Sequence, residues 1–70
     1  MDRNEDMVEI EVTVKMHGEK AVLIVNAIGD ESWIPYNIID DTSDIYERTP
    51  TGSTGTLVIP GWKAEELGWD

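Results

Sequence analysis

The chain has 70 residues and carries 15 Asp and Glu against 5 Lys and Arg, which gives a formal net charge of -10. This charge repels nucleic acid, anionic membranes and phosphate-rich ligands unless a local basic patch overrides it. The sequence contains no such patch, because its basic residues are scattered singly: Arg3, Lys15, Lys20, Arg48 and Lys63. Cysteine is absent and His17 is the only histidine, which excludes a disulfide framework and a structural zinc site.

The first half of the chain predicts an antiparallel meander. Residues 8–16 alternate, which places on one face the apolar side chains of Val8, Ile10, Val12, Val14 and Met16. A turn at residues 17–19 leads into residues 21–28, whose apolar run indicates a strand covered on both faces or paired at a dimer seam. Residues 32–35 form a short strand that Pro35 ends, with Trp33 assigned to the core.

The second half predicts a strand near residues 38–46, a mobile turn-rich loop over 49–55 and a last strand over 56–59. Pro60 or Gly61 then begins a short helix, and Gly68 suits the left-handed position after its end. At about 100° per residue Trp62 projects away from the face that carries Ala64 and Leu67. Whether Trp62 and Trp69 close the core or contact a partner stays open.

We therefore predict one mainly β domain over residues 1–70: a small bent antiparallel sheet or an SH3-like barrel of four to five strands, with one short C-terminal helix. Residues 1–7 are expected to be a flexible N-terminus. A domain this small has a marginal core, so a homodimer remains an open alternative. No run approaches the ~20 apolar residues of a membrane span and no signal core follows Met1, so we expect a soluble cytoplasmic protein that does not bind membranes.

From its residues we predict that the chain has no catalytic site, binds no metal and needs no cofactor. His17 lies beside Gly18 in what the pattern predicts to be an exposed turn, without a nucleophile or pocket. The run Asp40-Asp41-Thr42-Ser43-Asp44 lacks the glycine and the glutamate that an EF-hand loop needs at its sixth and twelfth positions. Residues 51–56 lack the lysine and the spacing of a phosphate-binding loop. We predict that the protein is not an enzyme.

The acidic side chains allow two interpretations. Glu9 and Glu11 share a strand face about 6.6 Å apart, and residues 40–47 add four more carboxylates. This charge either keeps the protein soluble and blocks edge-to-edge aggregation, or it binds a basic protein surface. In the second interpretation the partner-binding residues are Glu9, Glu11, Asp40, Asp41, Asp44, Glu47 and Trp62.

Residues 27–70 also resemble a family of small acidic phage and prophage proteins of unassigned function. The resemblance rests on Ser32-Trp33-Ile34-Pro35-Tyr36-Asn37-Ile38-Ile39, and on Pro60-Gly61-Trp62-Lys63-Ala64 with Gly68 and Trp69. The family pattern is Trp-Ile-Pro-x-Ser-x-Ile followed by Pro-x-Trp-x-Ala-x-x-x-Gly-Leu, so Asn37 and Trp69 depart from it. These motifs are structural, and no catalytic residue carries over.

The resemblance implies an anti-defence protein in the host bacterial cytoplasm. An inhibitor of this kind, such as an anti-CRISPR protein, would act as a nucleic-acid mimic that occupies a basic nucleic-acid-binding surface on a defence complex, without binding nucleic acid itself. An oligomeric sponge for a nucleotide immune signal is the second hypothesis, although the shortage of Lys and Arg argues against it. A structural or replication accessory of a phage is the third.

Overall fold

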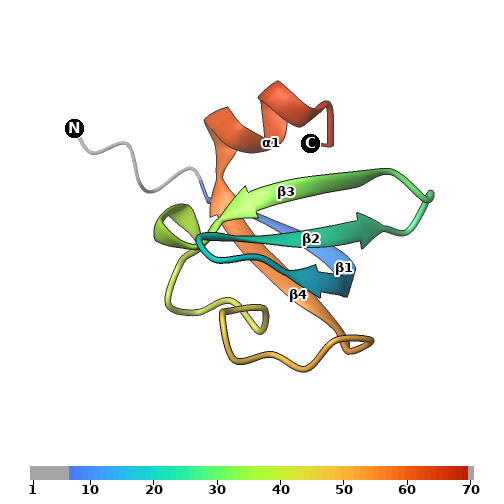
Figure 1. Ribbon diagram of the computed structural model, residues 1–70. Helices are drawn as coiled ribbons and strands as arrows, with labels where there is room; N and C mark the ends of the chain where they lie inside the picture. Colours follow the sequence, from blue (N-terminus) through green and yellow to red (C-terminus); the bar gives the residue numbers. More distant parts are fainter. Residues whose placement is uncertain (1–6, 70) are drawn as a thin grey trace.

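The computed structural model describes residues 7–69 and contains one antiparallel sheet with a helix at its C-terminal end (Figure 1). The elements are β1 (Met7–His17), β2 (Ala21–Asn26), β3 (Glu31–Pro35), the 3-10 turn η2 (Tyr36–Ile38), β4 (Thr54–Pro60) and α1 (Gly61–Leu67). The strand order is β3-β2-β1-β4. The predicted mainly β class is confirmed, and the sheet is open and curled rather than closed into a barrel.

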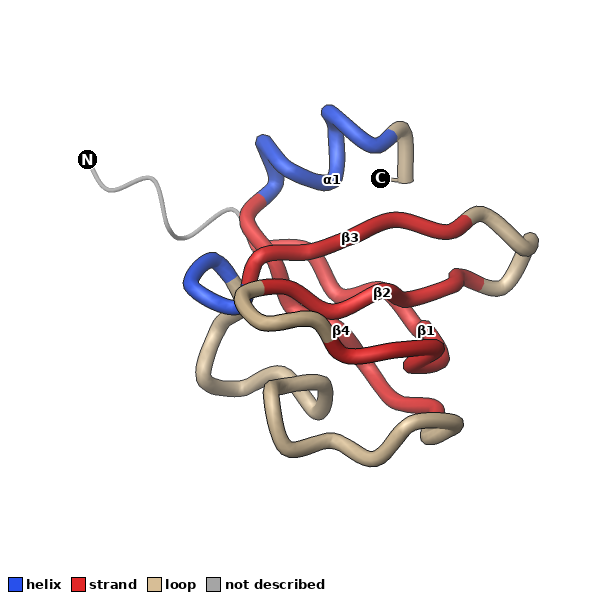
Figure 2. The backbone as a smooth tube through the Cα atoms, viewed as in Figure 1, coloured by secondary structure: helices blue, strands red, loops and turns tan. Residues whose placement is uncertain are grey.

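The curl of the sheet comes from β1, whose two halves pair with different strands. Residues 7–13 of β1 pair with β4, whereas residues 12–17 pair with β2, so the two ladders overlap only at Val12 and Thr13. One long strand thereby turns β4 away from the β2–β3 hairpin (Figure 2). The sheet consequently has an inner face that encloses the core and an outer face toward solvent.

The core lies on the inner face. Its buried cluster takes residues from every strand, together with one from the loop before β4 and one from α1: Val12, Val14, Val22, Ile24, Ile34, Ile45, Leu57, Ile59 and Ala64. Ile45 and Ala64 are 1% and 0% exposed, so the loop over residues 39–53 and α1 close the two open sides of the curled sheet. The alternation of Val12 and Val14 with polar neighbours predicts their inward orientation.

A β-bulge in β1 corrects two expectations. The register with β2 shifts between Val14 and Met16, because an inserted residue reverses the alternation beyond it. Met16 therefore lies on the outer face, 53% exposed, and not with the apolar row to which the alternation assigned it. His17 lies opposite buried Val22, is partly buried and is the last residue of β1, not part of an exposed turn.

Trp33 is also placed differently from the prediction. Neighbouring Ile34 is fully buried, so the pleat of β3 directs Trp33 to the outer face, where it is 45% exposed. Its ring lies over the β1–β2 turn: a Cβ added at Gly18 would be 3.0 Å from the ring. The sequence prediction assigned Trp33 to the core because it is a large aromatic residue in a short strand. Its position in the alternation of β3 places it on the outer face instead.

The strand expected near residues 38–46 is absent from the described chain, which is non-strand from Tyr36 to Ser53. The polar run 40–44 forms turns through its own side chains, since Asp40 Oδ2 accepts from the N–H and the hydroxyl of Thr42. The loop expected over 49–55 is shorter, because β4 begins at Thr54. Of the N-terminal segment 1–7, residues 1–6 lie outside the described residues and Met7 begins β1.

The C-terminal helix ends as the sequence predicts. Gly68 has a φ of 76°, and the N–H groups of Gly68 and Trp69 donate to the carbonyls of Glu65 and Ala64, which is the Schellman pattern. Trp69 packs against the core cluster, whereas Trp62 is 59% exposed. Among residues 7–69, no helix is both long and apolar enough for a membrane crossing.

Candidate acidic interface around β4

The outer edge of β4 is covered by the loop that precedes it. The N–H groups of Asp40 and Asp44 donate to the carbonyls of Val58 and Thr56, at 2.9 and 2.8 Å. The Asp44 carboxylate accepts the N–H of Thr56 at 3.2 Å. Main-chain and side-chain groups of the loop thus take the place of a fifth strand and satisfy an edge that would otherwise be open to another chain.

Ser43 is the buried centre of this contact. Its hydroxyl accepts the N–H groups of Ile45 (3.1 Å) and Val58 (3.2 Å), and lies within donating distance of the carbonyls of Ile45 (2.9 Å) and Thr56 (3.2 Å). Ser43 is 8% exposed, so water cannot readily replace these partners. One short side chain therefore ties the loop to β4 and sets the position of Asp40 and Asp44 on either side of it.

Gly55 lets the loop approach β4 closely. A Cβ at this position would be 2.9 Å from Cβ of Asp44, closer than non-bonded carbon atoms pack. The obstructing atom is fixed to the main chain of the loop, so a side chain here would displace Asp44 itself. The absence of a side chain at Gly55 is therefore part of what places this carboxylate.

Four predicted carboxylates flank β4 as a result. On one side Glu9 and Glu11 of β1 pair with Val58 and Thr56; on the other, Asp40 and Asp44 hydrogen-bond to the same two residues. β4 lies between β1 and the loop, and each neighbour is one strand spacing away from it. The main chain that carries Glu9 and Glu11 is therefore about 10 Å from the main chain that carries Asp40 and Asp44. We call this set the acidic surface: Glu9, Glu11, Asp40 and Asp44.

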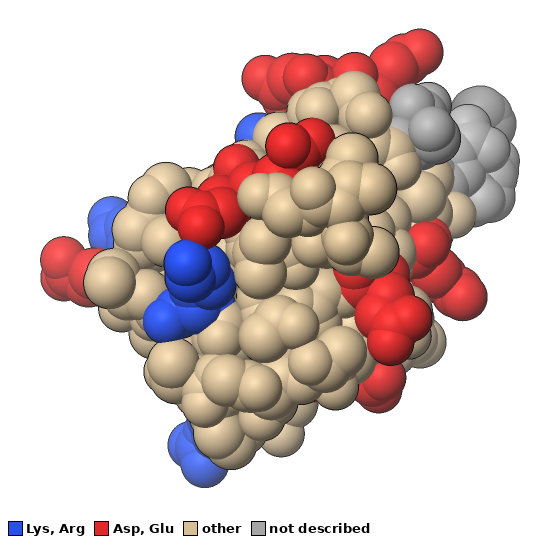
Figure 3. Space-filling model, turned by 90° about the vertical axis from the view of Figure 1, so that its right-hand side faces the viewer, with Lys and Arg blue, Asp and Glu red and all other residues tan. Residues whose placement is uncertain are grey.

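No ion pair joins a basic residue to the acidic surface within residues 7–69. The ion pairs of this part of the chain are Lys15–Glu31 and Lys63–Glu66, and neither involves these four carboxylates. Figure 3 shows the wider distribution on one face of the molecule, where acidic side chains outnumber basic ones and gather in its upper and right-hand parts. The acidic surface is thus available to an external cation.

An open groove of about 460 Å³ adjoins the acidic surface at Asp40. It combines carboxylates with two tyrosine rings, and it is lined by Tyr36, Ile39, Asp40, Asp41, Ser43, Tyr46, Glu47 and Arg48. Aromatic faces and carboxylates are both groups that attract a Lys or Arg side chain. Arg48 also lines the groove, and no ion pair joins it to a carboxylate of residues 7–69.

His17 fixes one wall of the groove. Its Nε2 lies against the carbonyl oxygen of Thr49, which only accepts, so Nε2 carries the proton. In the neutral ring Nδ1 then accepts from the hydroxyl of Tyr36, and the two rings stack at 5.9 Å. His17 joins β1, η2 and the loop, which is a structural role rather than that of a turn residue.

Two groups at the groove have shifted pKa values. Hydrogen bonds from the side chain and the N–H of Thr42 lower the pKa of Asp40 below 3.8, because both donors favour the ionised carboxylate. Burial first, and then the negative charge of Glu47, raise the pKa of Tyr36 above 10.0. At neutral pH the groove therefore presents an ionised Asp40 beside a neutral Tyr36.

The structure places the seven residues proposed from the sequence for partner binding in three locations. The acidic surface holds four, Asp41 and Glu47 line the groove, and Trp62 is exposed in the first turn of α1, directly after β4. Sequence reasoning did not include Tyr36 and Tyr46 in this set. An aromatic on each side of the acidic run 40–44 was the signal that could have found them.

Comparison of the chain with models of known families, with curated proteins and with solved structures finds no significant match. The resemblance to phage proteins rests on the quoted motifs alone. Within residues 7–69, no group of three or more His, Asp or Glu side chains converges in a metal-binding arrangement. The geometry available for assigning a function is therefore the acidic surface and its groove.

Proposed function

We propose that this protein is a non-enzymatic interaction protein that binds a basic surface on another protein and excludes nucleic acid from it. The observation that carries the proposal is the acidic surface: Glu9 and Glu11 of β1 lie on one side of β4, a hydrogen-bonded loop places Asp40 and Asp44 on the other, and no basic residue of the described chain is paired to them. The two aspartate carboxylates already accept hydrogen bonds, so they lose less conformational freedom on binding than loose side chains do.

The resemblance to phage proteins names the class of partner, a bacterial defence complex with a nucleic-acid channel. A channel of this kind is lined with Lys and Arg that contact phosphates. The main chains that carry the two acidic pairs lie about 10 Å apart across β4, and Glu9 and Glu11 are about 6.6 Å apart along β1, so the four carboxylates offer such a surface a two-dimensional array of negative charge. Long-range attraction of this origin weakens as salt rises.

Affinity capture from bacterial lysate, followed by competition, tests the proposal. The bait is compared with a variant that neutralises the acidic surface with nearly isosteric groups: Glu9→Gln, Glu11→Gln, Asp40→Asn and Asp44→Asn. A control variant removes the same amount of charge elsewhere: Glu19→Gln, Asp30→Asn, Glu65→Gln and Glu66→Gln. Because the net charge of both variants is equal, any difference between them reports position and not total charge.

The proposal expects a nucleic-acid-binding protein that the wild type and the control capture at low salt and that the site variant loses. The purified partner should release its nucleic acid when the wild type is added. A partner that the site variant retains as well as the control does would contradict the proposal, as would a partner whose nucleic acid stays bound.

A further inference from the structure

The outer face of the β1–β2–β3 part of the sheet carries an apolar patch that no described segment covers. Register places Leu23 between Met16 and Trp33, and Val25 between Thr13 and Glu31. Met16 and Trp33 are 53% and 45% exposed, while Leu23 and Val25 are partly buried by their neighbours alone. We call the four apolar residues the apolar face: Met16, Leu23, Val25 and Trp33.

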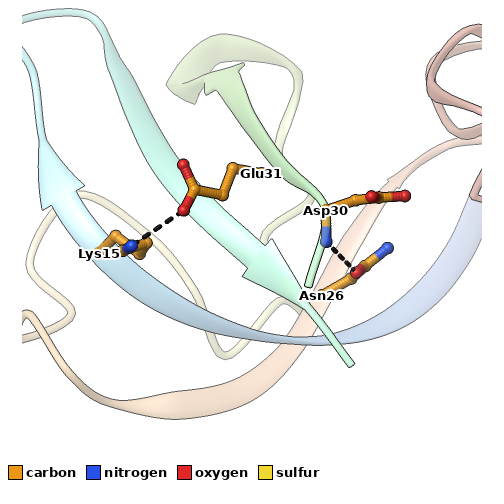
Figure 4. Close-up of polar contacts among 4 residues, drawn as sticks. All are labelled: Lys15, Asn26, Asp30 and Glu31. Carbon is orange, nitrogen blue, oxygen red and sulfur yellow. Dashed lines mark hydrogen bonds and ion pairs between the residues drawn. The ribbon is translucent and has the colours of Figure 1, made fainter. Parts of the chain in front are cut away.

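The apolar face carries balanced charge, unlike the rest of the chain. Lys15 of β1 and Glu31 of β3 reach across the middle strand β2, where their Nζ and Oε2 atoms are 2.9 Å apart, so one ion pair lies within the face (Figure 4). One positive and one negative charge cancel there, in a chain whose formal net charge is -10. Like-charge repulsion between two copies is therefore weakest where these faces meet.

The arrangement is also self-complementary. A two-fold axis running along β2 exchanges β1 of one copy with β3 of the other. It sets Met16 opposite the second copy's Trp33, Leu23 opposite its Leu23, and Thr13 opposite its Glu31. Sulfur–aromatic contacts are favourable, and the Lys15–Glu31 ion pair within each copy balances the charge of its face, so two copies of the face match without a further partner.

We propose that the apolar face is the interface of a weak homodimer, in which two sheets pack face to face. The face has four apolar residues, whereas a standard interface has about 20–30 residues on each side, so we expect the dimer to be weak. The inference does not depend on the proposed function, because the acidic surface lies around β4 and stays free in such a dimer. A dimer would present two acidic surfaces to a partner.

Sedimentation equilibrium from about 10 µM to about 1 mM protein tests the inference, in about 0.05 M and about 0.5 M NaCl. Screening of the repulsion between two anionic copies should tighten the dimer by about threefold or more at the higher salt. Binding through the acidic surface should weaken under the same change. The sign of the salt effect therefore separates a failure of this inference from a failure of the proposed function.

Two matched variants locate the interface. Met16→Glu adds one charge to the apolar face of each copy, hence two to the interface, and should weaken the dimer at least about tenfold. Ile28→Glu makes the same kind of change at a side chain that is 81% exposed at the β2–β3 turn, away from the face, and should change the dissociation constant less than about threefold.

A charge exchange tests the role of the balanced charge. Lys15→Glu should weaken the dimer, and the double variant Lys15→Glu with Glu31→Lys should restore it, since the face of each copy again carries one charge of each sign. A single monomeric species at about 1 mM in high salt would overturn the inference and leave the apolar face to another protein. Equal dissociation constants for the Met16→Glu and Ile28→Glu variants would overturn it as well.

Discussion

The two edges of the sheet are finished in different ways. The outer edge of β4 is covered by the loop over residues 39–53, whose buried Ser43 and Asp44 carboxylate bind its main chain. On the outer edge of β3, no strand of the described chain pairs with it. β3 has only five residues and ends at Pro35, which has no N–H group to donate to a further strand. One edge is thus closed by hydrogen bonds and the other is kept short.

The same division runs across the outer face. Around β4 it carries the acidic surface, and over β1, β2 and β3 it carries the apolar face with balanced charge. Charge acts at long range and weakens with salt, whereas apolar contact acts only on touching surfaces and is strengthened when salt screens repulsion. The difference teaches that a chain of 70 residues can separate a charged surface from an apolar one on a single sheet.

The largest expected loss of stability comes from removing the side chain that anchors the loop beside β4 in the core. Ile45→Ala removes the loop's fully buried anchor and should lower the free energy of unfolding by about 2–4 kcal/mol in urea titration. Val25→Ala, on the half-buried apolar face, should cost less than about 1.5 kcal/mol. Equal losses at the two positions would contradict the view that the loop is part of the core.

Removing the Ser43 hydroxyl should give the next largest effect. Ser43→Ala leaves the N–H groups of Ile45 and Val58 without this acceptor, and should cost about 2 kcal/mol of unfolding free energy. Ser53→Ala, at a half-exposed serine of the same loop, is the matched control and should change stability by less than about 0.5 kcal/mol. A Ser43→Ala variant as stable as this control would show that the loop does not depend on the hydroxyl.

Gly55→Ala sharpens the same comparison at the acidic surface. The new Cβ has to move Asp44, so we expect a loss of about 1–2 kcal/mol and amide shift changes in NMR spectra at Asp44 and Thr56. Gly52→Ala is the contrasting change, because Gly52 has a φ of 93° with open space around its added Cβ. Gly52→Ala should lower the stability of the fold only because alanine is strained at this positive φ, and it should leave the NMR signals of Asp44 unchanged.

The smallest expected effect concerns one ionisation. Thr42→Val removes the hydroxyl that donates to Asp40 but keeps the N–H, so the pKa of Asp40 should rise toward 3.8 in an NMR titration. Because the folded-state pKa is lowered, the stabilisation is present above pH 3.8 and is lost as the pH falls through the folded value. Thr51→Val in the exposed turn should leave this pKa unchanged, and an identical titration in both variants would contradict the assignment.

Part of the sheet could be predicted because β1 follows simple alternation as far as Val14. Val12 and Val14 are buried as this pattern indicates, and the proline and glycine signals correctly ended β3 and α1. The apolar run 21–28 predicts a strand covered on both faces, whereas β2 ends at Asn26, the outward side chains of Leu23 and Val25 are only partly buried, and Ile28 is 81% exposed. The bulge after Val14 could not be predicted, because no glycine or proline marks it. It changed the faces of Met16 and His17, and with them the surfaces available for binding.

The candidate site was predictable as a set of residues but not as an arrangement. The acidic residues could be named from charge alone, whereas their placement on both sides of β4 depends on hydrogen bonds between positions more than ten residues apart in the chain. The contacts of Ser43 with Val58 and of His17 with Thr49 leave no periodic signal in sequence. Long-range polar contacts of this kind are set by the folded chain.

The most direct test of the central claim is NMR mapping of an arginine-rich peptide on the folded protein at low salt. The account predicts amide shift changes centred on Glu9, Glu11, Asp40 and Asp44 and on the groove residues Tyr36 and Tyr46, fading as salt rises. Shift changes that centre instead on Glu65 and Glu66 of α1, or that spread evenly over all acidic positions, would contradict it.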